Sequence, residues 1–214
     1  MKKVAVEKAR GRVNRAASAM NGLEKSADFA SFSIAWTDFL LAANSVFSIL
    51  EKGAKDNATS RQWYGGKKKQ CRQDPLIRYL VQARNADEHG IEPVAVHAPG
   101  SFAIGAPGES VLLSNITVNA AGHTTALVHS VGGKLPTVEV QPPHPKLVAV
   151  YDDRFGGEWF QPPTKHLGMK LPSATPLPIA RLMVRFLTNL VDEAASYIRY
   201  PPHIVLNISR TTIS

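Results

Sequence analysis

A long apolar stripe near the N-terminus constrains the fold more than any other feature of this 214-residue chain. Large apolar side chains recur there at steps of three and four residues: Phe29, Phe32, Trp36, Phe39, Leu40, Ala43, Phe47 and Leu50. This spacing places them on one face of a helix, and a face this wide must be buried against other elements. Ser26 or Asp28 would cap the helix, and Gly53 would end it. The stripe predicts the central helix of a bundle.

Two neighbouring segments are expected to be helical as well. Residues 4–25 are rich in Ala, Lys, Arg and Glu with sparse apolar positions, which predicts a helix on the outside of the bundle. Residues 55–72 contain the break Gly65-Gly66, so a short helix followed by a basic loop is expected there.

Two more helices have clear start signals. Asp74 stands directly before Pro75, which places a capping side chain ahead of a proline at the first helical position, and Gly90 ends this helix. Residues 178–197 carry another wide apolar stripe. Such a helix is too hydrophobic to stand alone, so it is expected to pack back on the N-terminal helices or on a partner chain.

The composition changes between residues 91 and 172, where glycine, proline and β-branched residues dominate. Short alternating runs separated by turn sequences predict half-exposed antiparallel strands. These runs are residues 110–118, 124–129, 137–140 and 146–151. They predict a small sheet or sandwich of roughly four to six strands. The tail from Pro201 would add a last strand.

The expected fold class is therefore α+β. Residues 1–90 would form a helical bundle, residues 91–172 an inserted antiparallel β module, and residues 173–214 a C-terminal helix that packs back on the bundle, followed by a tail. Apolar residues make up 44% and charged residues 20% of the chain, values that are ordinary for a globular protein.

The charge is less ordinary, because the formal net charge is +8 and the isoelectric point is about 9.7. Basic residues cluster at the N-terminus and again at residues 67–72, a pattern that favours polyanions, nucleic acid first and an anionic membrane second. A solvated basic surface without a partner is the alternative. Cys71 is the single cysteine, so an intrachain disulfide and a four-cysteine zinc site are excluded. No signal peptide or apolar run of transmembrane length is apparent, which predicts a cytoplasmic protein without a membrane partner.

Candidate sites outside the helices are weak. His123 and His129 would share a strand face, but no spacing of histidine with cysteine or carboxylate matches a metal motif. Asp152, Asp153 and Glu158 would form either a carboxylate group or part of a glycine turn. The sequence also contains no phosphate-binding loop or dinucleotide fingerprint, so neither a metal nor a cofactor is expected.

The helix that starts at Pro75 carries Arg84, Asn85 and His89 near its end. A step of five residues turns an ideal helix by about 500°, so Arg84 and His89 would point some 140° apart. They would converge only if the helix loosened near Gly90 or if a second copy lay across it. Asn85 and His89 are one turn apart, so Asn85 could orient the imidazole. Arg84 needs an anion or a carboxylate such as that of Asp87 or Glu88, and an ion pair of this kind is the alternative to a functional site.

The segment LIRYLVQARNADEHG, with Arg84, Asn85 and His89 in the pattern Arg-Asn-x-x-x-His, resembles the signature of the HEPN superfamily. The resemblance covers the first ninety residues and the C-terminal helix, and it does not extend to the β module. It implies a helical-bundle homodimer whose two motif helices face each other across a groove. Many members are metal-independent endoribonucleases of toxin–antitoxin or phage-defence systems, which implies RNA and an antitoxin or regulatory protein as partners.

The same resemblance assigns roles to the motif residues. His89 would act as general acid or base at the RNA 2′-hydroxyl or the leaving oxygen, Arg84 would hold the scissile phosphate, and Asn85 would position one of them. Members silenced by nucleotide transfer carry a tyrosine two residues after the histidine. Ile91 stands at that place, so this kind of regulation is not implied.

Residues just before the motif helix would contact the RNA strand. Lys67, Lys68, Lys69 and Arg72 would follow its backbone, and Tyr64 or Trp63 would stack on a base. Non-catalytic HEPN proteins also exist, so the alternative function is an RNA- or nucleotide-binding or dimerisation module in which the β module acts as a sensor.

Overall fold

A computed structural model describes the chain apart from residues 106–110, 120–123, 130–136, 153–156 and 199–214. The protein is α+β and divides into two compact units. Met1–Ala95 and Leu147–Ser214 form the first, here called the helical unit, and Val96–Lys146 form the second, here called the β unit. The predicted tail strand after Pro201 lies outside the described residues.

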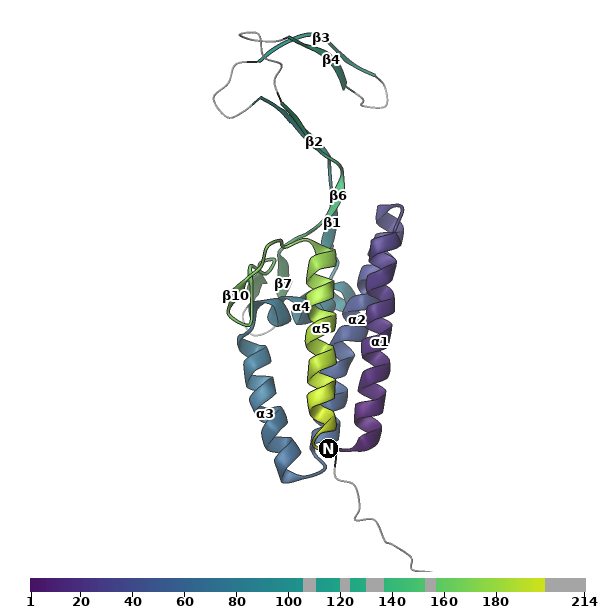
Figure 1. Cartoon of the computed structure of the whole chain (residues 1–214), viewed down its shortest axis with the longest axis vertical. Helices are drawn as coiled ribbons and strands as arrows, with labels where there is room; N and C mark the ends of the chain where they lie inside the picture. Colours follow the sequence, from purple (N-terminus) through teal and green to yellow (C-terminus); the bar gives the residue numbers. More distant parts are fainter. Residues whose placement is uncertain (106–110, 120–123, 130–136, 153–156, 199–214) are drawn as a thin grey trace, which may run out of the picture. The chain divides into compact units, whose positions relative to one another are not determined.

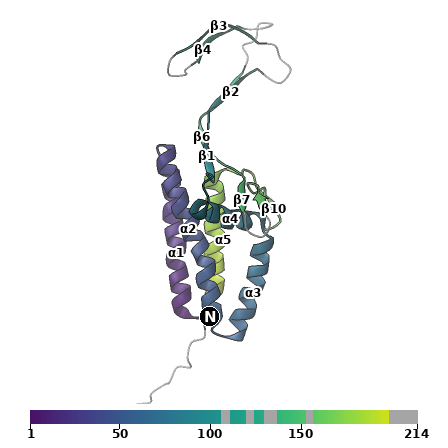
Figure 2. The ribbon, with the colours of Figure 1, turned by 180° about the vertical axis from the view of Figure 1, so that it is seen from behind.

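The helical unit contains all five helices of the described chain. They are α1 (Lys3–Lys25), α2 (Phe29–Ala54), α3 (Ala58–Gln73), α4 (Pro75–His89) and α5 (Pro176–Ala195). Figures 1 and 2 show α1, α2, α3 and α5 running roughly side by side, with α4 crossing them near one end. The late helix α5 packs on α1 and α2, which confirms its expected return to the N-terminal helices.

The core of this unit is built around α2. Its side chains Trp36, Phe39 and Leu40 are fully buried, and Ile179 and Met183 of α5 lie in the same core. By length and composition α2 is apolar enough to cross a membrane, contrary to the expectation that no segment would be. Its large side chains pack into the core of the unit, as they do in a soluble protein.

The predicted start of α2 is confirmed, and the helix ends one residue after the predicted stop, which leaves a different role for Gly53. Asp28 caps the helix by accepting a 2.7 Å hydrogen bond from the Ser31 amide. At the other end, α2 continues through Gly53 to Ala54. A Cβ atom on Gly53 would lie 2.4 Å from the Cβ of Ala5 on α1. Gly53 therefore permits close approach of two helices and does not terminate one.

The basic loop expected after residue 64 is instead part of α3. The helix passes without interruption through Gly65 and Gly66, whose missing Cβ atoms would meet nothing within 4 Å. Asn57 caps α3 through a 2.9 Å bond from the Ser60 amide, and the Tyr64 hydroxyl donates to the Phe47 carbonyl at 2.7 Å. The cap and the buried tyrosine outweigh the two glycines, so the following lysines lie on a helix.

Two short hairpins complete the helical unit. Strand β7 (Val150–Asp152) pairs with β8 (Glu158–Phe160), and β9 (Lys165–His166) pairs with β10 (Met169–Lys170). Strands β7, β8 and β9 pack against α4, and both hairpins belong to the helical unit, although the sequence grouped residues up to 172 with the β module.

The β unit consists of antiparallel pairs of strands. The pairs are β1 (Ala95–Ala98) with β6 (His144–Leu147), β2 (Ser101–Ile104) with β5 (Val138–Gln141), and β3 (Leu112–Val118) with β4 (Thr124–His129). The strands predicted at residues 110–118, 124–129 and 137–140 are confirmed, whereas the predicted run 146–151 is divided between β6 and β7. Each sheet in the described chain has two strands, so neither the small sheet of four to six strands nor the sandwich is found among the described residues.

Candidate functional site

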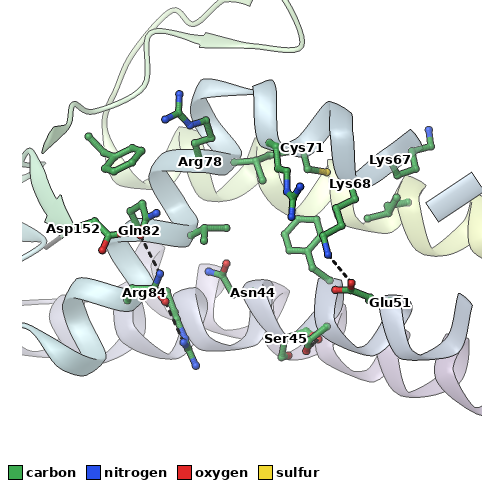
Figure 3. Close-up of a pocket in the computed structure, with 18 of the residues that line it drawn as sticks. Asn44, Ser45, Glu51, Lys67, Lys68, Cys71, Arg78, Gln82, Arg84 and Asp152 are labelled. Atoms are coloured by element: carbon green, nitrogen blue, oxygen red, sulfur yellow. Dashed lines mark hydrogen bonds and ion pairs between the residues drawn. The ribbon is translucent and has the colours of Figure 1, made fainter. Parts of the chain in front are cut away.

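A pocket of about 680 Å³ opens in the helical unit between α2, α3, α4 and the β7–β8 hairpin (Figure 3). This volume lies within the range of small-molecule sites, about 300–1,000 Å³. Its apolar wall is formed by Leu41, Phe47, Ile77, Val81, Phe160 and Leu190. Five cations also line it: Lys67, Lys68, Arg72, Arg78 and Arg84. The sequence led us to expect that Lys67, Lys68, Arg72 and Arg84 contact an anion, and all four line this pocket.

The turn between α3 and α4 brings these cations together. Asp74 precedes a proline, so its backbone is extended (φ −82°, ψ 121°) and α3 stops. Pro75 then starts α4 after a single intervening residue. On α3, Lys68 and Arg72 are one turn apart, and like charges at this spacing cost a few tenths of a kcal/mol unless an anion lies between them.

Four of the five cations have carboxylate partners. With their nitrogen–oxygen distances, the pairs are Lys67–Glu193 (2.7 Å), Lys68–Glu51 (2.6 Å), Arg78–Glu158 (3.1 Å) and Arg84–Glu88 (2.5 Å). Figure 3 shows Lys68 reaching from α3 toward Glu51 on α2. All four pairs are open to solvent, and such pairs typically contribute about 0–1 kcal/mol, so a phosphate can displace a carboxylate. Arg72 has no carboxylate partner among the described residues.

The lining is mixed in charge but positive on balance. Against its five cations stand three carboxylates, those of Glu51, Asp152 and Glu158, which leaves +5 − 3 = +2. Asp152 and Glu158 are direct cross-strand partners on β7 and β8, so two of the three carboxylates named for this segment line the pocket, whereas Asp153 lies outside the described residues. An anion would therefore bind toward α3 and α4, away from the hairpin.

The motif residues Arg84 and His89 do not converge on this pocket. The helix stays regular to His89, and the Gly90 amide donates to the Ala86 carbonyl at 2.7 Å, so α4 does not loosen at its end. Both side chains approach one oxygen of Glu88, Arg84 at 2.5 Å and His89 at 3.8 Å. Arg84 lines the pocket, but the His89 side chain is 71% exposed and lies outside it. The ion-pair alternative for Arg84 is thus present within one chain.

Asn85 lines the pocket together with Arg84 and is held by two neighbours. Its carbonyl oxygen accepts from the Arg84 guanidinium at 3.2 Å, and its amide donates to Gln82 at 3.0 Å. The expectation that Asn85 orients the His89 imidazole is therefore not met in the single chain. Asn85 instead positions the guanidinium at the pocket wall.

The aromatic residues expected to stack on RNA bases have structural roles. Tyr64 is 6% exposed, too little to offer a stacking face, and burial raises the pKa of its phenol. Trp63 stacks on Tyr197 at 5.1 Å and donates to Glu193 at 2.7 Å. Lys69 is exposed on α3 and is not among the residues that line the pocket.

Cys71 also lines the pocket, between the cations of α3. Burial, followed by the nearby charge of Asp74, raises the pKa of its thiol to about 11. A thiol with this pKa is almost entirely protonated at neutral pH, so Cys71 is unsuited to act as a nucleophile.

One buried contact beside the pocket was missed by the sequence. His166 on β9 is 6% exposed, and its Nδ1 lies 3.0 Å from Oδ1 of Asp74, the cap of α4. The other carboxylate oxygen accepts from the Leu167 amide at 2.6 Å. Burial alone would raise the pKa of Asp74, but the bonds from His166, Leu167 and Ile77 hold it below the ordinary value. The contact fastens the β9–β10 hairpin to the start of α4.

The described residues contain no group of three or more His, Cys, Asp or Glu side chains that could hold a metal ion. Comparison of the chain with family models, with curated proteins and with solved structures finds no match. The resemblance to the HEPN superfamily therefore rests on Arg84, Asn85 and His89 alone.

Proposed function

We propose that the pocket of the helical unit binds a nucleotide of single-stranded RNA, and that one chain binds without cleaving. The observation that carries this proposal is the gathering of Lys68, Arg72 and Arg84 around a single cavity with an apolar wall. An uncleaved strand is favoured because His89, the only proton carrier of the motif, lies outside the cavity.

The chemistry of the wall suits the parts of a nucleotide. A guanidinium group can donate two parallel hydrogen bonds to two oxygens of one phosphate. Arg72 is available for such a contact because no described carboxylate binds it. The Arg78 guanidinium lies 5.1 Å from the centre of the Phe160 ring, forming a flat surface on which a base could stack. Asp152 and Glu158 could accept hydrogen bonds from base amino groups. We propose a reducing cytoplasm as the compartment. A free thiol at Cys71 and an RNA ligand both agree with that location.

Alanine at Arg72 or at Arg84 is expected to weaken binding of a fluorescent single-stranded RNA oligomer by about tenfold, because each change removes a charge-assisted bond to phosphate. Each should also flatten the slope of log affinity against log salt by about 0.7. Fluorescence anisotropy at several salt concentrations measures both quantities, and free mononucleotides tested in parallel distinguish a strand from a single nucleotide.

The matched control is Arg181→Ala, since Arg181 pairs with Glu24 at 2.6 Å and neither residue lines the pocket. The affinity of the Arg181→Ala variant for RNA should stay within twofold of that of the unmodified protein. No measurable binding at low salt, or an equal loss in the control, would reject the pocket as the site.

A homodimeric HEPN-type endoribonuclease is the second candidate function. This second proposal includes an HEPN-like arrangement of the helices in the bundle. Arg84 and His89 both lie within 4 Å of one Glu88 oxygen, and the exposed imidazole is accessible to a second copy. RNA cleavage is then expected in the presence of EDTA, with His89→Ala reducing the rate by at least 100-fold, the contribution typical of a general acid or base. Full activity of a folded His89→Ala protein would end this candidate.

A further inference from the structure

The β unit is almost free of charge. It contains two acidic residues, Glu109 and Glu139, and two basic residues, Lys134 and Lys146, so its net charge is zero. The whole formal charge of +8 therefore belongs to the helical unit. An uncharged unit has little attraction for RNA, and its function must be sought in another kind of contact.

The described side chains of the β unit form no core. Among its residues whose side chains are described, none is buried. Large apolar side chains of the β3–β4 hairpin are exposed instead: Leu112 by 61%, Ile116 by 58%, Val118 by 65% and Leu127 by 54%. An isolated two-stranded hairpin is marginally stable in water, so this hairpin is expected to gain strands or a packing surface from elsewhere.

Among the described residues β3 is the only strand that pairs with β4, so the outer edge of β4 is open for pairing. Sheet edges are usually protected by charged residues, prolines or bulges. Strand β3 has such a bulge, a register shift between Ser114 and Thr117, with Asn115 at a positive φ of 51°. Strand β4, with the sequence TTALVH, has no charge, no proline and no shift of its own. Its outer edge can therefore accept another strand along its whole length.

We infer that β4 pairs antiparallel with β4 of a second copy of this chain, giving a four-stranded sheet across a two-fold axis. Antiparallel pairing of a strand with its own copy is self-complementary, since each residue contact occurs twice. The absence of charged side chains on β4 suits the same occupant, because two copies of an uncharged edge meet without local repulsion. A charged protein partner would find no opposite charge on β4.

The inference is tested on the full-length protein by sedimentation velocity over a range of concentrations. The unmodified chain should form a dimer, and Leu127→Lys should raise its dissociation constant at least tenfold by placing a lysine from each copy at the new seam. Met169→Lys is the matched control, because Met169 is 68% exposed but lies on β10 of the helical unit. It should remain dimeric.

Hydrogen exchange provides a second measurement that does not depend on a substitution. The amides of β4 should exchange more slowly as protein concentration rises, whereas those of α1 should not change. A monomer throughout the concentration range would overturn the inference. So would a dimer that survives Leu127→Lys with β4 amides that exchange equally fast at all concentrations.

Discussion

Replacing Asp74 with alanine is expected to lower the free energy of unfolding by about 4 kcal/mol. The change removes the cap of α4, worth about 1 kcal/mol. It also leaves two hydrogen-bond donors without an acceptor, the buried His166 ring and the Leu167 amide. Each unsatisfied donor destabilises the folded protein by about 1–3 kcal/mol. Urea denaturation followed by far-ultraviolet circular dichroism measures the loss.

Asp28→Ala is the matched control, because Asp28 also caps a helix but is exposed and has no distant partner. It should cost about 1 kcal/mol. The pKa of Asp74 is lowered in the folded protein, so its ionic contribution is complete above the ordinary value of 3.8 and is lost as the pH falls below that value. Equal losses for the two variants at pH 7 would contradict the role of the buried contact.

Alanine at Gly53 is expected to destabilise the protein by about 2 kcal/mol, although alanine is the better helix former. The new Cβ would lie 2.4 Å from the Cβ of Ala5, so α1 and α2 must separate. Overpacking of this kind costs about 3 kcal/mol at the upper end of its usual range, against a propensity gain of about 1 kcal/mol. Thermal denaturation gives the sign directly.

The same substitution at Gly65 or Gly66 should have the opposite sign. Both positions lie inside α3 with open space around the missing Cβ, so alanine there should stabilise by about 1 kcal/mol. If Gly53→Ala also stabilised, the close packing of α1 on α2 would be refuted.

The helices could be predicted because their signals are local. The caps Asp28 and Asp74, the proline after Asp74 and the apolar stripes all act within a few residues, and each of these elements was found where the sequence placed it. Glycine misled the prediction twice. A glycine near the end of a stripe can stop a helix or let two helices touch, and only the position of Ala5 decides between these roles at Gly53.

The candidate site was predictable in part for the same reason. The cluster of basic residues before Asp74, and the need of Arg84 for an anion or a carboxylate, indicated where cations gather. The acceptors that hold these cations come from distant segments: Glu193 binds Lys67, and Glu158 binds Arg78. The Asp74–His166 contact joins residues 92 positions apart, and no pattern along the chain signals it.

The β unit leaves and rejoins the rest of the chain at nearly one point. Strands β1 and β6 pair beside this junction, and the Val148 amide donates to the Val94 carbonyl at 3.5 Å. The two ends that a deletion of residues 96–146 would create are therefore neighbours already, and a tight reverse turn would suffice to rejoin them. The β unit is an insertion in the helical unit. Exchanging this insertion for an unrelated module is expected to leave the backbone path of the helical unit unchanged.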